Sequence, residues 1–251
     1  MVQRKVQQAA ITTSELRLQR LYSLGILLLC MSLFSACALS NQWSASHPSY
    51  TKKPSPNESI GFIVAENAFI LTRSKWFSNR LNVPMDSIHQ KTDELISSTF
   101  KSTLQEHYPK LKTIPTAVQN TLPEESQKLD RVVFIKGHFP SQGMEIATES
   151  GEKPPYLLIL HEFIIGTDLK RSIYFDYTQN QQEIEFQPLV KNVTVIASYT
   201  LWDNFNQRPL LSSIIEIQHP FANDLAMNDL KALAQKAAKQ IEREIREKVR
   251  Q

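Results

Sequence analysis

Two cysteines are the most reactive side chains in the sequence, and both lie near its amino terminus. Cys30 and Cys37 fall within or just after an apolar stretch, and no cysteine occurs from Ala38 to Gln251. The rest of the chain therefore offers no disulfide, thiol nucleophile or cysteine-bound metal. Cys37 follows the small residues Ser35 and Ala36, whereas Cys30 follows a bulky leucine. Cys37 is therefore the better acceptor for a modification made as a leader is removed.

The histidines are scattered along the chain and show no spacing typical of a metal site. They are His47, His89, His107, His138, His161 and His219. We predict that none of them binds a metal and that each packs or hydrogen-bonds within the fold. His161 and Glu162 are neighbours in a predicted strand, so we expect their side chains to point to opposite faces of the sheet.

The sequence lacks the motifs of common enzyme classes. Its glycines are too sparse for a phosphate-binding loop, and no Gly-x-Ser-x-Gly turn occurs. Paired carboxylates lie in polar stretches typical of solvated surface: Glu124 with Glu125, and Glu183 with Glu185. We predict a protein that is not an enzyme and holds no cofactor. A cryptic hydrolase would need His138 or His161 hydrogen-bonded to a serine and an acid in a cleft.

The net charge of +3 belongs to the first part of the chain. Residues 1–36 contain four basic residues and one acidic residue, whereas the remainder has 24 of each sign. A surface that neutralises many phosphates needs a clustered basic excess. We therefore expect no nucleic-acid partner.

The leader combines positive charge with an apolar stretch. Arg17 and Arg20 precede the apolar segment Leu21–Ala36, which ends in small residues. This organisation predicts a signal peptide over residues 1–36. An alternative is an uncleaved signal anchor in the inner membrane, because Leu21–Leu39 is just long enough to span a bilayer. Both interpretations place the rest of the chain outside the cytoplasm.

The end of the leader, Leu33–Cys37 with the sequence LFSAC, resembles the lipobox of bacterial lipoprotein precursors. It departs from that pattern at Phe34, where the class usually has leucine. The resemblance implies lipid on the Cys37 thiol, and several acyl chains make a durable membrane anchor. Ala38 rather than Asp follows the cysteine. In such lipoproteins this implies the outer membrane, with the body facing the periplasm.

The remainder of the chain divides into two parts. Residues 37–58 are rich in Ser, Pro, Asn and Lys, which predicts a flexible, lipid-anchored tether. Residues 59–251 are predicted to form a single domain. Apolar and β-branched runs predict strands over 60–72, 111–114, 131–137, 156–165, 171–177, 188–203 and 210–218.

Two amphipathic patterns predict helices, one over Asp86–His107 and a longer one from Asp224 to the end of the chain. In the longer helix, Glu242 with Arg246 and Glu244 with Lys248 form favourable pairs that we assign to its outer face. The order of elements predicts an α+β fold. Its sheet would be mostly antiparallel, with the helix of the N-terminal half and the C-terminal helix packed on one face.

The stretch Tyr199–Ile217, YTLWDNFNQRPLLSSIIEI, resembles a layout of envelope lipoproteins together with the helix that follows it. In that layout a long strand ends in Leu-x-Asp, a turn leads into a returning strand, and a closing helix packs on the sheet. Auxiliary lipoproteins of lipid-transport systems show it. Lipoproteins related to the curli secretion channel and to activators of peptidoglycan synthases show it as well. The turn here lacks the glycine that those families often carry.

These features predict a non-catalytic, lipid-anchored envelope lipoprotein that acts as an interaction or assembly module. We expect an envelope protein partner, bound through a sheet edge or hairpin tips. Trp202, beside the predicted turn, either anchors such a partner or packs on its own sheet. The alternative function is a carrier or sensor of a small hydrophobic ligand such as a lipid, which needs an apolar pocket between helices and sheet. The oligomeric state stays open.

Overall fold

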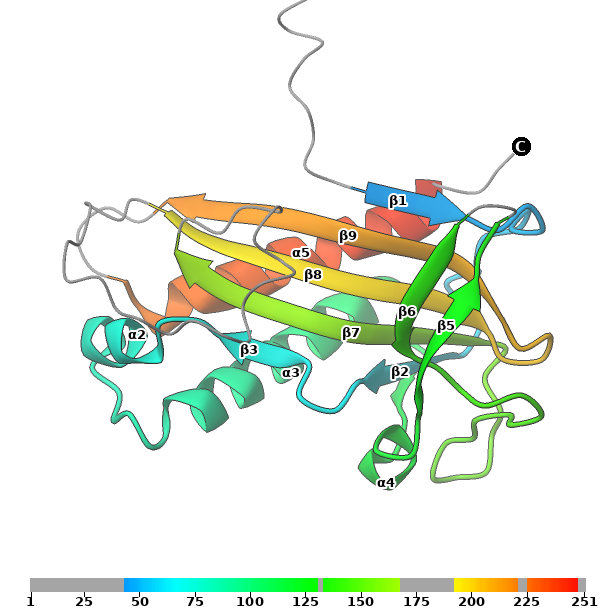
Figure 1. Ribbon diagram of the computed structural model, residues 1–251, viewed down its shortest axis with the longest axis horizontal. Helices are drawn as coiled ribbons and strands as arrows, with labels where there is room; N and C mark the ends of the chain where they lie inside the picture. Colours follow the sequence, from blue (N-terminus) through cyan, green and yellow to red (C-terminus); the bar gives the residue numbers. More distant parts are fainter. Residues whose placement is uncertain (1–42, 131–132, 168–191, 221–224, 248–251) are drawn as a thin grey trace, which may run out of the picture. The chain divides into compact units, whose positions relative to one another are not determined.

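The computed structural model describes residues 43–130, 133–167, 192–220 and 225–247. Figure 1 shows a long sheet with α3 and α5 along one face and the hairpin of β5 and β6 over the other. The strands are β1 Trp43–Ser46, β2 Ile60–Val64, β3 Phe69–Leu71, β4 Leu111–Thr113, β5 Glu124–Lys128, β6 Phe134–His138, β7 Tyr156–Thr167, β8 Asn192–Asp203 and β9 Arg208–Pro220. The helices are α2 Ser74–Leu81, α3 Ile88–His107, α4 Thr116–Gln119 and α5 Met227–Glu247.

Three long strands form the centre of the sheet. Strands β7, β8 and β9 pair antiparallel, and β1 adds to the outer edge of β9. Strands β2 and β3 pair with β7 in parallel, and β4 pairs in parallel with β2. The predicted α+β class is confirmed, but the sheet is mixed. The helices α2 and α3 between β2 and β4 act as a crossover, and such a connection returns the chain in the same direction.

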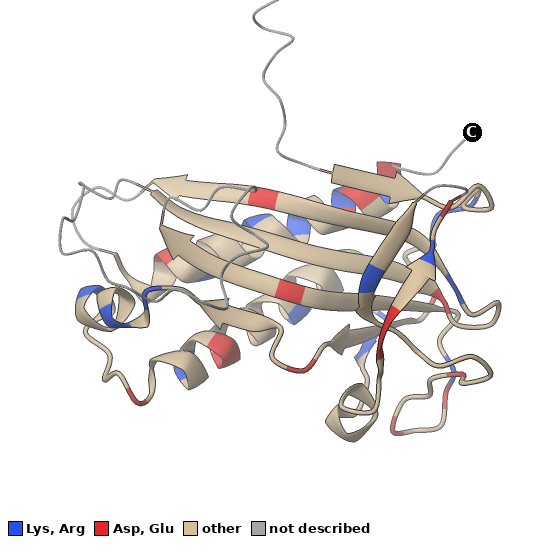
Figure 2. Cartoon of the chain, viewed as in Figure 1, with Lys and Arg blue, Asp and Glu red and all other residues tan. Residues whose placement is uncertain are grey.

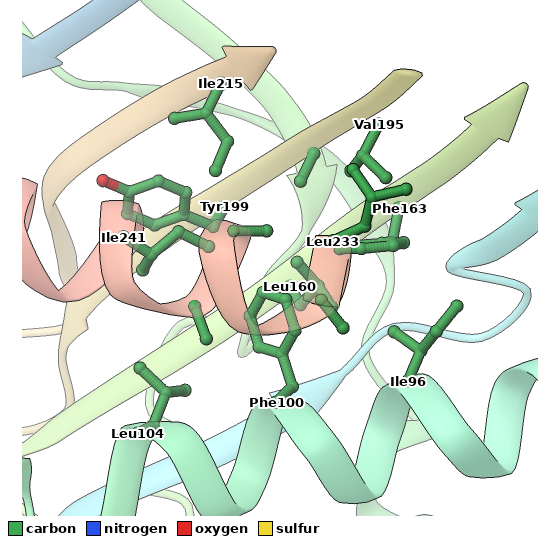
Figure 3. Packing of buried hydrophobic residues seen from close by; sticks show 14 of the residues in the cluster. Ile96, Phe100, Leu104, Leu160, Phe163, Val195, Tyr199, Ile215, Leu233 and Ile241 are labelled. Atoms are coloured by element: carbon green, nitrogen blue, oxygen red, sulfur yellow. The ribbon is translucent and has the colours of Figure 1, made fainter. Parts of the chain in front are cut away.

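The helices cover one face of the sheet, as predicted. Phe100 of α3 meets Phe163 of β7 edge to face, with ring centroids 5.5 Å apart. In α5 the residues that contact the core recur every three or four positions, and several are alanines that let the helix lie close to the strands. Figure 3 shows Leu233 and Ile241 of α5 and Ile96, Phe100 and Leu104 of α3 among the strand side chains.

A second, smaller core lies on the other face, under the hairpin of β5 and β6. Ile135 and Phe139 pack there against Ile159 and Trp202 of the main sheet. The strand predicted at 131–137 therefore exists in part, as β6, but it pairs with β5 rather than with the central strands. The sequence Glu124–Lys128 has no apolar residue and was not predicted as a strand. It becomes one because β6 supplies a hydrogen-bonding partner.

The predicted tether over residues 37–58 needs a correction. Residues 37–42 lie outside the described residues, but Trp43–Ser46 form a strand on β9, and Tyr50 is 1% exposed. The Tyr50 hydroxyl donates a hydrogen bond of 2.7 Å to the carbonyl of Ile245 in α5. The folded domain therefore includes residues from Trp43 onward rather than from residue 59. Polar composition did not prevent folding because an existing sheet edge supplied the backbone partners.

Several sequence-based predictions fall on residues that the structure does not describe. They are the signal peptide over 1–36, lipid on Cys37, the edge strand at 171–177, the pair Glu183 and Glu185, and the helix start at Asp224. Within the described part of the chain, no helix has both the length and the apolar composition needed to cross a membrane.

Charged residues are spread over the described elements. Figure 2 shows Lys and Arg mixed with Asp and Glu on helices and loops, while the long central strands carry few charges of either sign.

Candidate functional site

His161 is the most deeply buried histidine among the described residues. It lies in β7 under the hairpin, 8% exposed, with its ring 5.0 Å from that of Phe139. Its Nε2 is 2.9 Å from Thr200 Oγ1, and that hydroxyl is 3.2 Å from Ser212 Oγ. Burial lowers the pKa of His161 to about 3, with a smaller contribution from nearby His138. The imidazole is therefore neutral at physiological pH and hydrogen-bonded to a threonine.

His161 and Glu162 do not point to opposite faces, so that prediction was wrong. A β-bulge between Leu160 and Glu162 places one extra residue in β7, opposite Tyr199 and Ser198 of β8. His161 contacts Phe139, and the Glu162 carboxylate hydrogen-bonds Ser198, on the face that the hairpin covers. Burial raises the pKa of Glu162, and the Ser198 hydrogen bond partly offsets that effect.

The other histidines also make contacts within the fold. His138 Nδ1 lies 3.0 Å from the carbonyl of Leu122, and His219 Nε2 lies 3.1 Å from Asp229 Oδ1. No histidine, aspartate or glutamate group in the described ranges has an arrangement that could hold a metal ion. Neither His138 nor His161 is joined to both a serine and an acid in the way a hydrolase requires.

A buried carboxylate on the helical face was missed by sequence reasoning. Glu244 of α5 is 4% exposed, not on the outer face as predicted. Its Oε2 accepts hydrogen bonds from Tyr199 Oη at 3.0 Å and Ser213 Oγ at 2.6 Å, and its Oε1 accepts one from Gln240 Nε2 at 3.0 Å. These bonds fasten α5 to β8 and β9. Glu244 lies three positions after Ile241 and seven after Ala237, spacings that place all three on one face of the helix, and that periodicity was the available signal.

The aromatic beside the turn packs on its own sheet. Trp202 is 1% exposed and stacks on Phe139 with ring centroids 5.5 Å apart. The next aromatic along the chain, Phe205, is instead 54% exposed. It lies in the turn between β8 and β9, residues Asp203–Arg208, which we call the β8–β9 tip.

Hydrogen bonds within the β8–β9 tip fix its backbone. Asp203 Oδ1 accepts the N–H groups of Phe205 and Asn206 at 3.2 and 2.9 Å. Asp203 Oδ2 accepts a further bond from Asn206 Nδ2 at 2.8 Å. Gln207 adopts the left-handed region with φ 51°, which an ordinary residue rarely does. The turn therefore presents Phe205 on a frame that is already ordered.

Asn204 ties the tip to the loop that precedes β7. Its side chain is fully buried, its Oδ1 accepts the Ile146 N–H at 2.9 Å, and its Nδ2 donates to the carbonyls of Ile146 and Pro154 at 2.8 and 2.9 Å. Gln207 Oε1 also accepts the Gly143 N–H at 2.6 Å. The tip and this loop consequently form one supported surface around Phe205.

A groove of about 480 Å³ lies beside the edge strand β4. Its lining is mainly polar and includes Lys101, Gln105, Lys112, Thr113 and Glu149. This groove is not the apolar pocket that a carrier of a hydrophobic ligand needs.

Comparisons with known proteins assign no family to the chain. No protein-family model matches the sequence, and no curated protein matches it. Structures of the PelC dodecamer from Paraburkholderia phytofirmans are similar to it at 9% identity, over 80% of this chain and 94% of that one, with a TM-score of 0.36. A single-residue variant of that PelC gives 8% identity, 78% and 91% coverage, and a TM-score of 0.33. A likeness this low carries no argument about function or assembly.

Proposed function

We propose that this protein is a lipid-anchored, non-catalytic lipoprotein of the cell envelope, and that its folded domain binds a protein partner through the β8–β9 tip. The anchor rests on the sequence LFSAC ending at Cys37. The choice of an interaction module over an enzyme is supported by the buried, internally bonded state of His161 and Glu244.

One observation carries the choice of surface, the 54% exposure of Phe205 on a turn whose polar groups are already bonded. An exposed aromatic ring offers a large apolar contact area, and aromatic residues are enriched among those that dominate binding energy. Because the tip is ordered before binding, little conformational entropy is lost on association. A membrane is a poorer fit than a protein pocket, since Asp203–Arg208 contains one acidic and one basic residue and no basic cluster.

Site-specific photo-crosslinking in intact cells tests this proposal. A photoreactive phenylalanine analogue replaces Phe205 in one variant, and Phe134, which is 65% exposed on β6, in the matched control. We expect a discrete protein adduct from position 205 and not from position 134. We also expect the Phe205→Ala protein to lose the ability to compete for that partner. Equal adducts from both positions, adducts with lipid only, or no adduct from position 205 would contradict the β8–β9 tip as the binding surface.

A further inference from the structure

The described part of the chain covers only a portion of the outer edge of β9. Strand β1 pairs with Leu211–Ile214, whereas β9 continues to Pro220. Among the described residues, no strand pairs with the outer edge of β9 from Ile215 onward. An uncovered strand edge offers backbone donors and acceptors to another strand.

The hydrogen-bonding pattern shows which residues present those groups. The His47 N–H donates to the carbonyl of Leu210 at 2.7 Å, so Leu210 faces the β1 side. Backbone groups of alternate residues in an antiparallel strand point to the same neighbour. Glu216 and Gln218 therefore direct their N–H and C=O groups outward, while Ile217 directs its own toward β8. Pro220 has no N–H and ends the row of donors.

The side chains at this edge are complementary to a second copy of the same edge. In an antiparallel pair of two β9 strands centred on Ile217, each Glu216 lies opposite the other copy's Gln218, and each Ile217 lies opposite its equivalent. The two side chains already interact within one chain, where Gln218 Nε2 donates to Glu216 Oε1 at 3.0 Å. No carboxylate would face another carboxylate, and Ile217, already partly buried against the main core, would gain an apolar neighbour.

We propose that two copies of this protein associate through the edge of β9, antiparallel and centred on Ile217, so that their sheets become continuous. The ladder spans Ile215–His219, because Trp43 occupies the position opposite Ile214 and Pro220 ends the donors. Four backbone hydrogen bonds join Glu216 and Gln218 of the two copies. This interface has two-fold symmetry, with the same patch on each copy. It goes beyond the proposed function and does not require the lipid on Cys37. Confinement to a membrane would nevertheless raise the local concentration of the copies.

Disulfide trapping of the full chain tests the register. Ile217→Cys places the new thiol opposite itself at a position without hydrogen bonds, where side chains are closest. We expect rapid formation of a covalent dimer on mild oxidation. Gln218→Cys is the matched control, because that thiol faces position 216 of the other copy and forms the dimer slowly. Removal of Cys30 and Cys37 in a second set of variants shows whether trapping depends on the anchor.

A charge change tests the same contact without a thiol. Gln218→Glu sets two carboxylates opposite each other at each end of the ladder, and we expect a dimer dissociation constant raised at least tenfold in analytical ultracentrifugation. Gln142→Glu, the same change on the exposed loop before β7, is expected to leave it unchanged. A monomeric wild-type protein at every concentration, or equal trapping at positions 217 and 218, would overturn the proposal. Either result leaves crosslinking at Phe205 unaffected, so the two claims fail separately.

Discussion

Glu244 and Tyr199 join the closing helix to the centre of the sheet through a hydrogen bond of 3.0 Å between Tyr199 Oη and Glu244 Oε2. Burial, and then the neighbouring Glu244 carboxylate, raise the pKa of the Tyr199 hydroxyl well above its usual range. The hydroxyl is therefore protonated at neutral pH and acts as the donor of this bond. Because the carboxylate is buried, its hydrogen bonds are needed to offset its lost hydration.

Removal of this carboxylate should destabilise the domain strongly. Glu244→Ala leaves the hydroxyls of Tyr199 and Ser213 with fewer partners, and we expect the free energy of unfolding to fall by about 2–4 kcal/mol. Tyr199→Phe keeps the ring and should cost about 1–2 kcal/mol. Glu247→Ala, at an exposed position of the same helix, should change it by less than about 0.5 kcal/mol. Urea unfolding followed by circular dichroism measures all three. Equal effects of Glu244→Ala and Glu247→Ala would contradict the network.

The buried His161 predicts a loss of stability in acid. Its pKa is about 3 in the folded state, against an ordinary value of 6.5, so below pH 6.5 the unfolded chain binds a proton that the folded chain does not. Above pH 6.5, His161 therefore makes no contribution to the pH dependence of stability. It falls as the pH drops toward 3, by at most about 1.4 kcal/mol per pH unit. His161→Gln should flatten that dependence while leaving the effect of Glu162 in place. The free energy of unfolding of the wild-type protein and of His161→Gln is measured at pH values from about 4.5 to about 7.5. If it changes with pH by the same amount in both proteins, His161 is accessible to protons.

Gly137 and His161 are coupled by close packing. A methyl group added at Gly137 would lie 2.7 Å from two atoms of the His161 ring, Cε1 and Nδ1. Gly137→Ala should therefore destabilise the domain by about 1–3 kcal/mol. In the background of His161→Ala the same change should have a much smaller effect. A double-mutant cycle by thermal or urea unfolding measures the coupling free energy, and strictly additive effects would contradict the contact.

Asn204 should contribute more to stability than its neighbour Asn206. Asn204→Ala removes three buried hydrogen bonds to Ile146 and Pro154, and we expect a loss of about 2–4 kcal/mol. Asn206→Ala, at the exposed end of the same turn, should cost less than about 1 kcal/mol. Hydrogen exchange at the Ile146 amide should quicken in the first variant only. Unchanged protection at Ile146 in Asn204→Ala would show that the Asn204 hydrogen bonds are not formed in solution.

The sequence predicted the elements whose signal is carried by their own residues. Strands β7, β8 and β9 contain long β-branched and apolar runs, and α3 and α5 have apolar residues at helical spacing. Elements that depend on a partner were not predicted. The segments Trp43–Ser46 and Glu124–Lys128 are too polar to indicate strands. Each forms a strand because a neighbouring strand supplies its backbone hydrogen-bonding partners.

The candidate site was predicted only in outline. Hairpin tips were expected to bind a partner, but the aromatic residue predicted as a possible anchor was Trp202, which is buried. Phe205 was overlooked because the orientation of a turn residue depends on bonds from Asp203 and Asn204, and sequence periodicity does not report such bonds. The bulge at His161 was missed for a similar reason, since an inserted residue in a strand leaves the apolar run intact.

Lipidation of Cys37 is the central claim, and metabolic labelling of the full-length protein with a radioactive fatty acid tests it most directly. The wild-type protein and the matched control Cys30→Ala should both carry the label and partition with detergent. Cys37→Ala should carry none and should keep its leader, so that it migrates more slowly. Label retained in Cys37→Ala, or absent from the wild-type protein, would contradict an anchor at this cysteine.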